Sequence, residues 1–345
     1  MTTLTVPGRS GNKASLRPVP WRRMAWVTWR QHRLALAGVA ALLGVLALYV
    51  WLTGLQLHQA YATVTACHPA SSLACQNIAD NFNSTYSSTA EAFAGLLQAV
   101  PALIGAFVGA PVLARELETG TFGYTWTQGF GRWRWALAKL VPLAVVVTAA
   151  AWLFSLLFSW FFQPFLLEGN QTPLAPAVFD LRGIAFAAWT LAAFAIGALA
   201  GMVIRRVVAA IGTTLAIYAA LALATGIYLR QHYLTPLRTT VMNVPGSAWI
   251  MSQQWETTKG GHPVSLSVLY QILQGAHVQS AGKGGGLPQS SSMDQFLTQH
   301  GYTHWTIYQP GSRFWAFQWI EGGWLLVLSV LLIAVAVWLV RRRAA

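Results

Sequence analysis

The chain of 345 residues is too apolar to be a soluble globular protein, because 55% of its residues are hydrophobic and only 9% carry a charge. A typical soluble domain has about 25% charged residues. The formal net charge is +13, but most basic residues stand beside apolar segments, which argues against a nucleic-acid partner and for a lipid membrane. We therefore expect an all-α integral membrane protein.

The N-terminal region divides into a tail and a helix. Residues 1–20 carry Pro, Gly, Ser and basic residues without an apolar period, so we expect a mobile basic tail. Residues 21–33, WRRMAWVTWRQHR, place arginines on one side of a helix and apolar residues on the other, which predicts a helix on the inner membrane surface. A plain basic flank that sets the topology is the alternative. The arginines concerned are Arg22, Arg23, Arg30 and Arg33.

Six segments have the length and apolar character needed to cross a bilayer, which takes about 20 residues. Spans one to five occupy residues 34–229, and residues 317–345 hold span six with a basic end. The expected spans are Leu34–Leu55, Glu91–Leu113, Leu140–Phe162, Arg182–Ile204, Val207–Leu229 and Ile320–Val340.

Basic residues fix the orientation, because they occur in alternate short loops. The loops Gln56–Ala90 and Gln163–Leu181 contain no Lys or Arg, so we place them outside and both termini in the cytoplasm of a multi-pass cell-membrane protein. Cys67 and Cys75 both fall in the first outer loop. On an oxidising face a disulfide is favoured over a metal site, since two thiolates alone bind zinc poorly.

Residues 230–316 are too long for a simple loop and predict a small mixed α/β extracellular domain. Within it SSMDQFLTQHG indicates a short helix with Ser292 as a possible N-cap, and YTHWTIYQ alternates like a strand. His300 and His304 are interpreted as exposed side chains, not as metal ligands. The aromatic stretch Tyr308–Trp324 then leads into span six.

This aromatic stretch is typical of a belt at the outer membrane interface. A functional alternative is an outer hinge that controls a gate, with a salt bridge between Arg313 and Glu321. The hinge residues are Arg313, Trp315, Trp319 and Glu321.

The chain offers no chemistry of its own that could drive transport or catalysis. AGKGGG lacks the Ser or Thr and the upstream Gly of a phosphate-binding loop and is interpreted as a flexible connection. No ionisable residue lies near the midpoint of a span, which argues against an ion-driven carrier. A nucleophile–base pair or a set of metal ligands within the spans is also missing, so we expect no catalytic residues.

One interruption stands out between spans two and three, ARELETGTFGYTWTQGFGRWRWALAK at residues 114–139. A basic, aromatic inner turn explains its Arg and Trp residues, and Gly120 is suited to end a helix. It does not explain Glu116 and Glu118, which the positive-inside rule does not require.

The segment resembles the cytoplasmic loop of type-two ABC export permeases. In that family an acidic residue, a Gly-Thr pair, a turn, an Arg and then a Lys lie between spans two and three. The family often has Pro before the Arg, whereas this chain has QGFGR. The resemblance extends to the six-span topology and is closest to small drug- or antibiotic-export permeases paired with a separate ATPase. The matching residues are Glu116, Glu118, Gly120, Thr121, Arg132 and Lys139.

The resemblance implies a permease homodimer with two copies of an ABC ATPase, which would bind ATP and Mg. The permease itself would be no enzyme and hold no cofactor. A coupling helix in residues 114–139 would contact the ATPase, flanked by the surface helix. The coupling residues would be Arg115, Glu116, Glu118, Gly120, Thr121, Gln128, Gly129, Arg132 and Lys139.

By the same resemblance spans two and five face each other across the dimer and line a path for a hydrophobic or amphipathic drug, antibiotic, lipid or peptide. Helix packing or lipid contact is the alternative at each position. A second hypothesis for the whole chain is a non-transporting mechanical or signalling membrane subunit driven by a partner ATPase. The path residues would be Leu97, Val100, Phe107, Val108, Thr213, Ile217, Tyr218 and Leu221.

Overall fold

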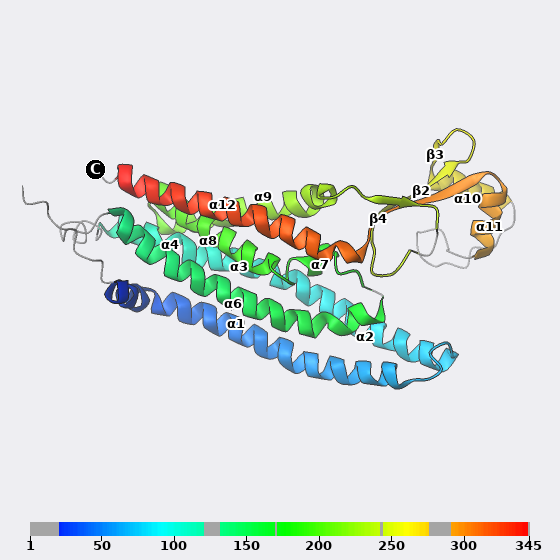
Figure 1. Cartoon of the computed structure of the whole chain (residues 1–345), viewed down its shortest axis with the longest axis horizontal. Coiled ribbons are helices and arrows are strands. Elements are labelled where there is room, and N and C mark those ends of the chain that lie inside the picture. Colours follow the sequence, from blue (N-terminus) through cyan, green and yellow to red (C-terminus); the bar gives the residue numbers. More distant parts are fainter. Residues whose placement is uncertain (1–20, 121–131, 170, 242–243, 276–290, 344–345) are drawn as a thin grey trace, which may run out of the picture.

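A computed structural model of the chain describes residues 21–120, 132–169, 171–241, 244–275 and 291–343. Long helices run side by side as one elongated bundle, and a small sheet with two short helices stands beyond one end (Figure 1). We call this the sheet end. The opposite end, where α1 begins and the C-terminus lies, holds Arg33, Arg115, Lys139, Arg205 and Arg342 and is called the basic end.

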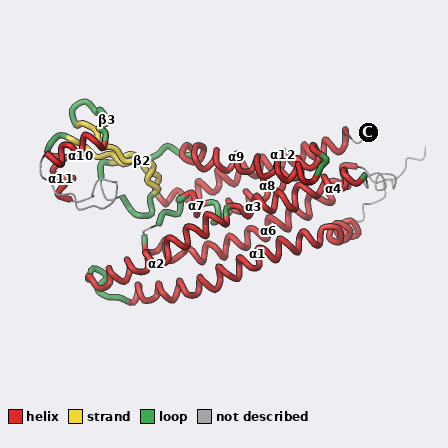
Figure 2. The backbone as a smooth tube through the Cα atoms, turned by 180° about the vertical axis from the view of Figure 1, so that it is seen from behind, coloured by secondary structure: helices red, strands yellow, loops and turns green. Residues whose placement is uncertain are grey.

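The first two helices form a hairpin that is longer than the sequence predicts. α1 (Trp21–Ala66) begins where the surface helix is expected, and its first turns point out of line with the rest (Figure 2). It continues past the expected end of span one, and α2 (Leu73–Leu97) starts soon after. A disulfide between Cys67 and Cys75, with a Cα–Cα distance of 5.6 Å, closes the turn and confirms the predicted bond. Most of the predicted first outer loop is therefore helical.

Span two consists of α2, α3 (Ala99–Ile104), the π-helical turn η1 (Gly105–Gly109) and α4 (Ala110–Thr119). It packs backbone to backbone against α8 (Ala185–Ile204). A Cβ added at Gly197 would overlap the carbonyl oxygen of Gly105, and one added at Gly109 would overlap that of Phe194. Small residues permit this close approach of membrane helices. The wider π turn lies at the contact.

α8 is the central helix, with 72% of its apolar window buried. α6 (Arg132–Glu168) and α12 (Phe314–Arg343) pack on it together with span two. α9 (Val207–Ala224) also packs on it and continues through the π turn η2 (Thr225–Leu229) and the 3-10 turn η3 (Arg230–His232), but only 17% of this span's window is buried. Six helical segments among the described residues have the length and apolarity of membrane spans, as predicted.

The sheet is antiparallel with the strand order β1-β4-β2-β3. Its small core contains Trp255, Leu269 and Leu297. β4 begins and ends at the residues of the predicted strand. The predicted short helix is present but starts at Ser291, so Ser292 lies inside it and is not its N-cap. The elements are β1 (Leu237–Thr239), β2 (Trp249–Thr257), β3 (Pro263–Val264), α10 (Leu266–Gly275), α11 (Ser291–Gln299) and β4 (Tyr302–Gln309). The AGKGGG segment lies outside the described residues.

Candidate functional site

At the basic end, the acidic residues of α4 contact other spans of the same chain. Glu116 forms an ion pair with Lys139 of α6. The Lys139 side chain is nearly buried, and its Nζ lies 4.8 Å from the centre of the Trp135 ring. The charge and the ring together stabilise the ammonium group away from water. Glu116 and Lys139 therefore connect spans two and three.

Glu118 connects span two to span five. Its Oε2 accepts a hydrogen bond from the backbone N–H of Val207, with an N–O distance of 3.0 Å. Val207 is the first residue of α9, and Arg206 at the N-cap makes no side-chain capping bond. The carboxylate thus supplies the missing cap from a neighbouring helix, at the end where the helix dipole favours negative charge.

Of the remaining predicted coupling residues, some lie in the part of the chain that the structure describes and others lie outside it. Arg115 has an exposed side chain, and Gly120 ends α4 in the left-handed conformation, with φ of 69°. Thr121, Gln128 and Gly129 lie outside the described residues. Arg132 begins α6, but its side chain is outside what the structure describes.

The surface-helix arginines all lie within α1. Arg30 and Arg33 are exposed, whereas the side chains of Arg22 and Arg23 are outside the described part.

The predicted path is only partly compatible with the fold. Spans two and five pack against each other within one chain. Leu97, Val100 and Val108 are buried in the main core with residues of α1 and α6, so the prediction that they line a path is wrong for this structure. The other path residues are Phe107 and Ile217, which are exposed, Thr213 and Leu221, which are half-buried, and Tyr218, which is buried with its ring centre 5.5 Å from that of Trp189.

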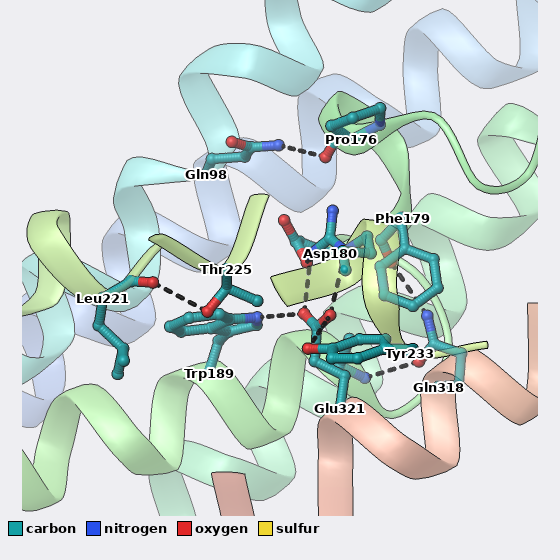
Figure 3. A network of polar contacts seen from close by, with 12 residues as sticks. Gln98, Pro176, Phe179, Asp180, Trp189, Leu221, Thr225, Tyr233, Gln318 and Glu321 are labelled. Carbon is teal, nitrogen blue, oxygen red and sulfur yellow. Dashed lines mark hydrogen bonds and ion pairs between the residues drawn. The ribbon is translucent and has the colours of Figure 1, made fainter. Parts of the chain in front are cut away.

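At the sheet end a buried ionic cluster joins spans five and six (Figure 3). Arg230 is 1% exposed and Glu321 is 0% exposed. The guanidinium donates from Nε to Oε2 over 3.0 Å and from Nη2 to Oε1 over 2.8 Å. Nη2 also donates to the carboxylate of Asp180. A two-point bond of this kind is the strongest arrangement of Arg with a carboxylate.

Aromatic side chains complete the coordination of Glu321. The indole N–H of Trp189 donates to Oε1 over 2.8 Å, and the Tyr233 hydroxyl donates to Oε2 over 3.1 Å (Figure 3). These donors come from α8 and from the residue after η3. Glu321 therefore accepts bonds from three side chains, which satisfies a charge that is costly to bury.

Gln318, one turn before Glu321, binds the segment that precedes span four. Its Oε1 accepts from the backbone N–H groups of Ile184 and Ala185, at 3.0 and 2.9 Å. Its Nε2 donates to the carbonyl of Phe179 in the short helix α7 (Pro176–Phe179) over 3.1 Å. Gln318 thus caps the start of α8 and holds α7 in place beside Asp180.

The surroundings of Asp180 favour its protonated form. Burial raises the pKa of its carboxyl to about 8; Arg230 opposes this rise and Glu321 adds to it. Removal of the carboxyl from water disfavours its charged form, which explains the direction, and the nearby Glu321 acts the same way. Within the described ranges, no three His, Cys, Asp or Glu side chains are grouped so that they could hold a metal ion.

The predicted salt bridge between Arg313 and Glu321 is wrong. Arg313 and Glu321 are eight positions apart, which is about 12 Å along a helix axis and too far for the two side chains to form an ion pair. Arg313 instead donates from Nη1 to the carbonyl of Thr235 over 2.7 Å and to Gln309 Oε1 over 2.6 Å. Trp315 and Trp319 are exposed beside it, which fits the belt interpretation.

Comparison with known families now identifies the chain. Residues 40–230 match the family model described as ABC-2 membrane transporter related. The chain belongs to this family. The match begins within span one and ends at Arg230, which belongs to the buried cluster. Neither a curated protein nor a solved structure matches the chain.

Membership of the ABC-2-related family makes the chain a multi-pass membrane protein of the permease type. The family also implies a partner ATPase, because its members are membrane subunits of ABC transporters.

Proposed function

We propose that the chain is the permease subunit of an ATP-driven exporter, acting as a homodimer with two copies of a separate ATPase that binds ATP and Mg. The basic end lies in the cytoplasm and the sheet end outside the cell. Alternate basic loops support this orientation. The cargo is a hydrophobic or amphipathic compound.

The observation that carries this proposal is the pair of contacts made by the end of α4. Glu116 contacts Lys139 of α6, and Glu118 caps α9. A partner that moves the segment 114–139 therefore displaces spans three and five as well as span two. An ATPase can shift the equilibrium between two arrangements only if it contacts them differently, and the exposed Arg115 beside these carboxylates provides such a contact.

The exposed apolar faces support a second copy and an apolar cargo. Only 17% of the apolar window is buried in span one and in span five. Phe107 and Ile217, which are 56% and 47% exposed, belong to the predicted path and remain available to line it. Lipid covers whatever part of these faces the second copy does not.

Mechanical signalling is the second candidate, and the continuity of the sheet with the spans favours it. β1 begins soon after η3 at the end of span five, and β4 passes through the 3-10 turn η4 (Gly311–Arg313) into α12. Movement of these two spans therefore reaches the sheet directly.

The test is co-purification of the chain with its ATPase in lipid nanodiscs, followed by ATP hydrolysis assays with added amphipathic compounds. We expect Arg115→Glu to lower permease-dependent ATP hydrolysis severalfold while membrane insertion is unchanged. Arg342→Glu reverses another exposed charge at the basic end, on α12, and should leave hydrolysis unchanged.

Equal hydrolysis in the Arg115→Glu and unchanged proteins would refute coupling through this segment. If the chain stimulates ATP hydrolysis by its partner normally but no added compound changes the rate, the mechanical signalling function is favoured over export.

A further inference from the structure

A cavity of about 500 Å³ lies at the sheet end between α3, α7 and the outer half of span five. Its walls include three aromatic residues, Trp189, Tyr218 and Trp249. Asp180 and Arg230 of the buried cluster also line it. A concave, mostly apolar site with a few convergent polar groups is the usual form of a small-molecule pocket.

Arg230 brings an unused donor to this cavity. Its Nε and Nη2 bind Glu321 and Asp180. Nη1 is buried and has no hydrogen-bond partner among the described residues. A buried donor without a partner costs about 1–3 kcal/mol, and a ligand oxygen that accepts from Nη1 would remove that cost.

Asp180 supplies the complementary acceptor. Its side chain is 22% exposed, and it accepts from Arg230. A protonated carboxyl group keeps acceptor capacity on its oxygens, so an oxygen of Asp180 can accept from a ligand N–H group. The cavity therefore offers one donor and one acceptor from adjacent side chains.

The charges select against an ionic ligand head. A ligand carboxylate would lie near the buried carboxylate of Glu321, and like charges in a desolvated site repel strongly. A ligand ammonium group would lie beside the Arg230 guanidinium and could not accept from Nη1. An amide group has one N–H donor and one carbonyl acceptor and brings no net charge.

We propose that this cavity binds an uncharged amphipathic amide of the peptide type. Its carbonyl accepts from Arg230 Nη1, its N–H donates to Asp180, and its apolar body packs on the rings of Trp189, Tyr218 and Trp249. Naming this ligand a cargo rests on the proposed export function, whereas the binding site itself does not.

Two glycines of span five provide a matched test of the location. Gly226 lines the cavity, and Gly212 lies on the same span away from it. A Cβ added at either glycine meets nothing within 4 Å. Gly226→Leu should fill the cavity, and Gly212→Leu adds the same side chain elsewhere.

The measurement is equilibrium binding of tritiated N-acetyl-leucyl-leucine amide to the purified full chain in lipid nanodiscs, without ATPase. We expect saturable binding to the unchanged chain and to Gly212→Leu, and its loss in Gly226→Leu. Equal binding to both variants, or no saturable binding to the unchanged chain, overturns the proposal.

A second measurement tests the ligand chemistry. The same blocked dipeptide with a free terminal carboxylate should bind about tenfold more weakly than the amide, as expected when polar groups of a site are mismatched. Equal affinity for the two overturns the amide assignment. Because no ATPase is present, saturable binding with normal selectivity stands even if the export test fails.

Discussion

The two ends of span five are held by charged side chains in different ways. At the basic end, one bond from the exposed Glu118 caps α9. At the sheet end, Arg230 is buried in a cluster with Asp180 and Glu321. An exposed single contact contributes little and can be exchanged for a partner, whereas a buried multi-bond pair is costly to break. The contact at the basic end therefore allows span five to move when a partner binds, whereas the buried cluster holds the span in place at the sheet end.

The largest effect should come from breaking the sheet-end cluster. Glu321→Gln leaves the buried Arg230 guanidinium without its main counter-charge, which typically costs about 3–5 kcal/mol. We expect a large drop in the unfolding temperature of the purified protein in detergent. Glu91→Gln makes the same chemical change at an exposed carboxylate that accepts from Gln171, and it should have almost no effect.

Similar unfolding temperatures for Glu321→Gln and Glu91→Gln would show that the cluster does not fix this end of span five.

A smaller, local effect is expected at the basic end. Glu118→Ala removes the cap of α9, and lost caps cost about 1 kcal/mol. Amide hydrogen exchange should accelerate over the first turn from Val207, while exchange near Arg230 stays unchanged. Glu118→Gln keeps an oxygen that can accept from the Val207 N–H and should exchange more slowly than Glu118→Ala.

If exchange at Val207 were the same in both variants and the unchanged protein, Glu118 would not be the cap, and the inner contact between spans two and five would need another explanation.

Local patterns predict much of this fold. Runs of apolar residues locate six spans, and alternation locates the strand Tyr302–Gln309. The position of two cysteines in one outer loop predicts their disulfide. Each of these features depends on residues that lie close together in the chain.

The site residues depend instead on which helices become neighbours. Glu118 and Val207 are 89 positions apart, and Arg230 and Glu321 are 91 apart. At the ends of apolar spans both members of the second pair look like ordinary interfacial flanks. The sequence also does not show which side of a helix would face a path, because the side that packs in the core and the side that contacts lipid are both apolar. Val108 is buried and its neighbour Phe107 is exposed, although both fit the pattern.

A further predicted effect is a pH dependence of stability confined to the sheet end. The pKa of Asp180 is raised from its ordinary 3.8 to about 8 by burial, with Glu321 adding to the rise and Arg230 opposing it. Between these two values the folded protein holds a proton that the unfolded chain has released. Stability from this group is therefore complete below the ordinary pKa and is lost as the pH rises through about 8.

Asp180→Asn removes this titration, so the fall in unfolding temperature between about pH 5 and about pH 9 should be a few degrees smaller than in the unchanged protein. Glu118→Gln, which changes a carboxylate at the opposite end, should keep the full fall. Identical pH profiles for Asp180→Asn and the unchanged protein would mean that Asp180 titrates as it does in water. In that case the cluster would hold span five with its excess negative charge in place, and the sheet end would be less tightly closed than its burial indicates.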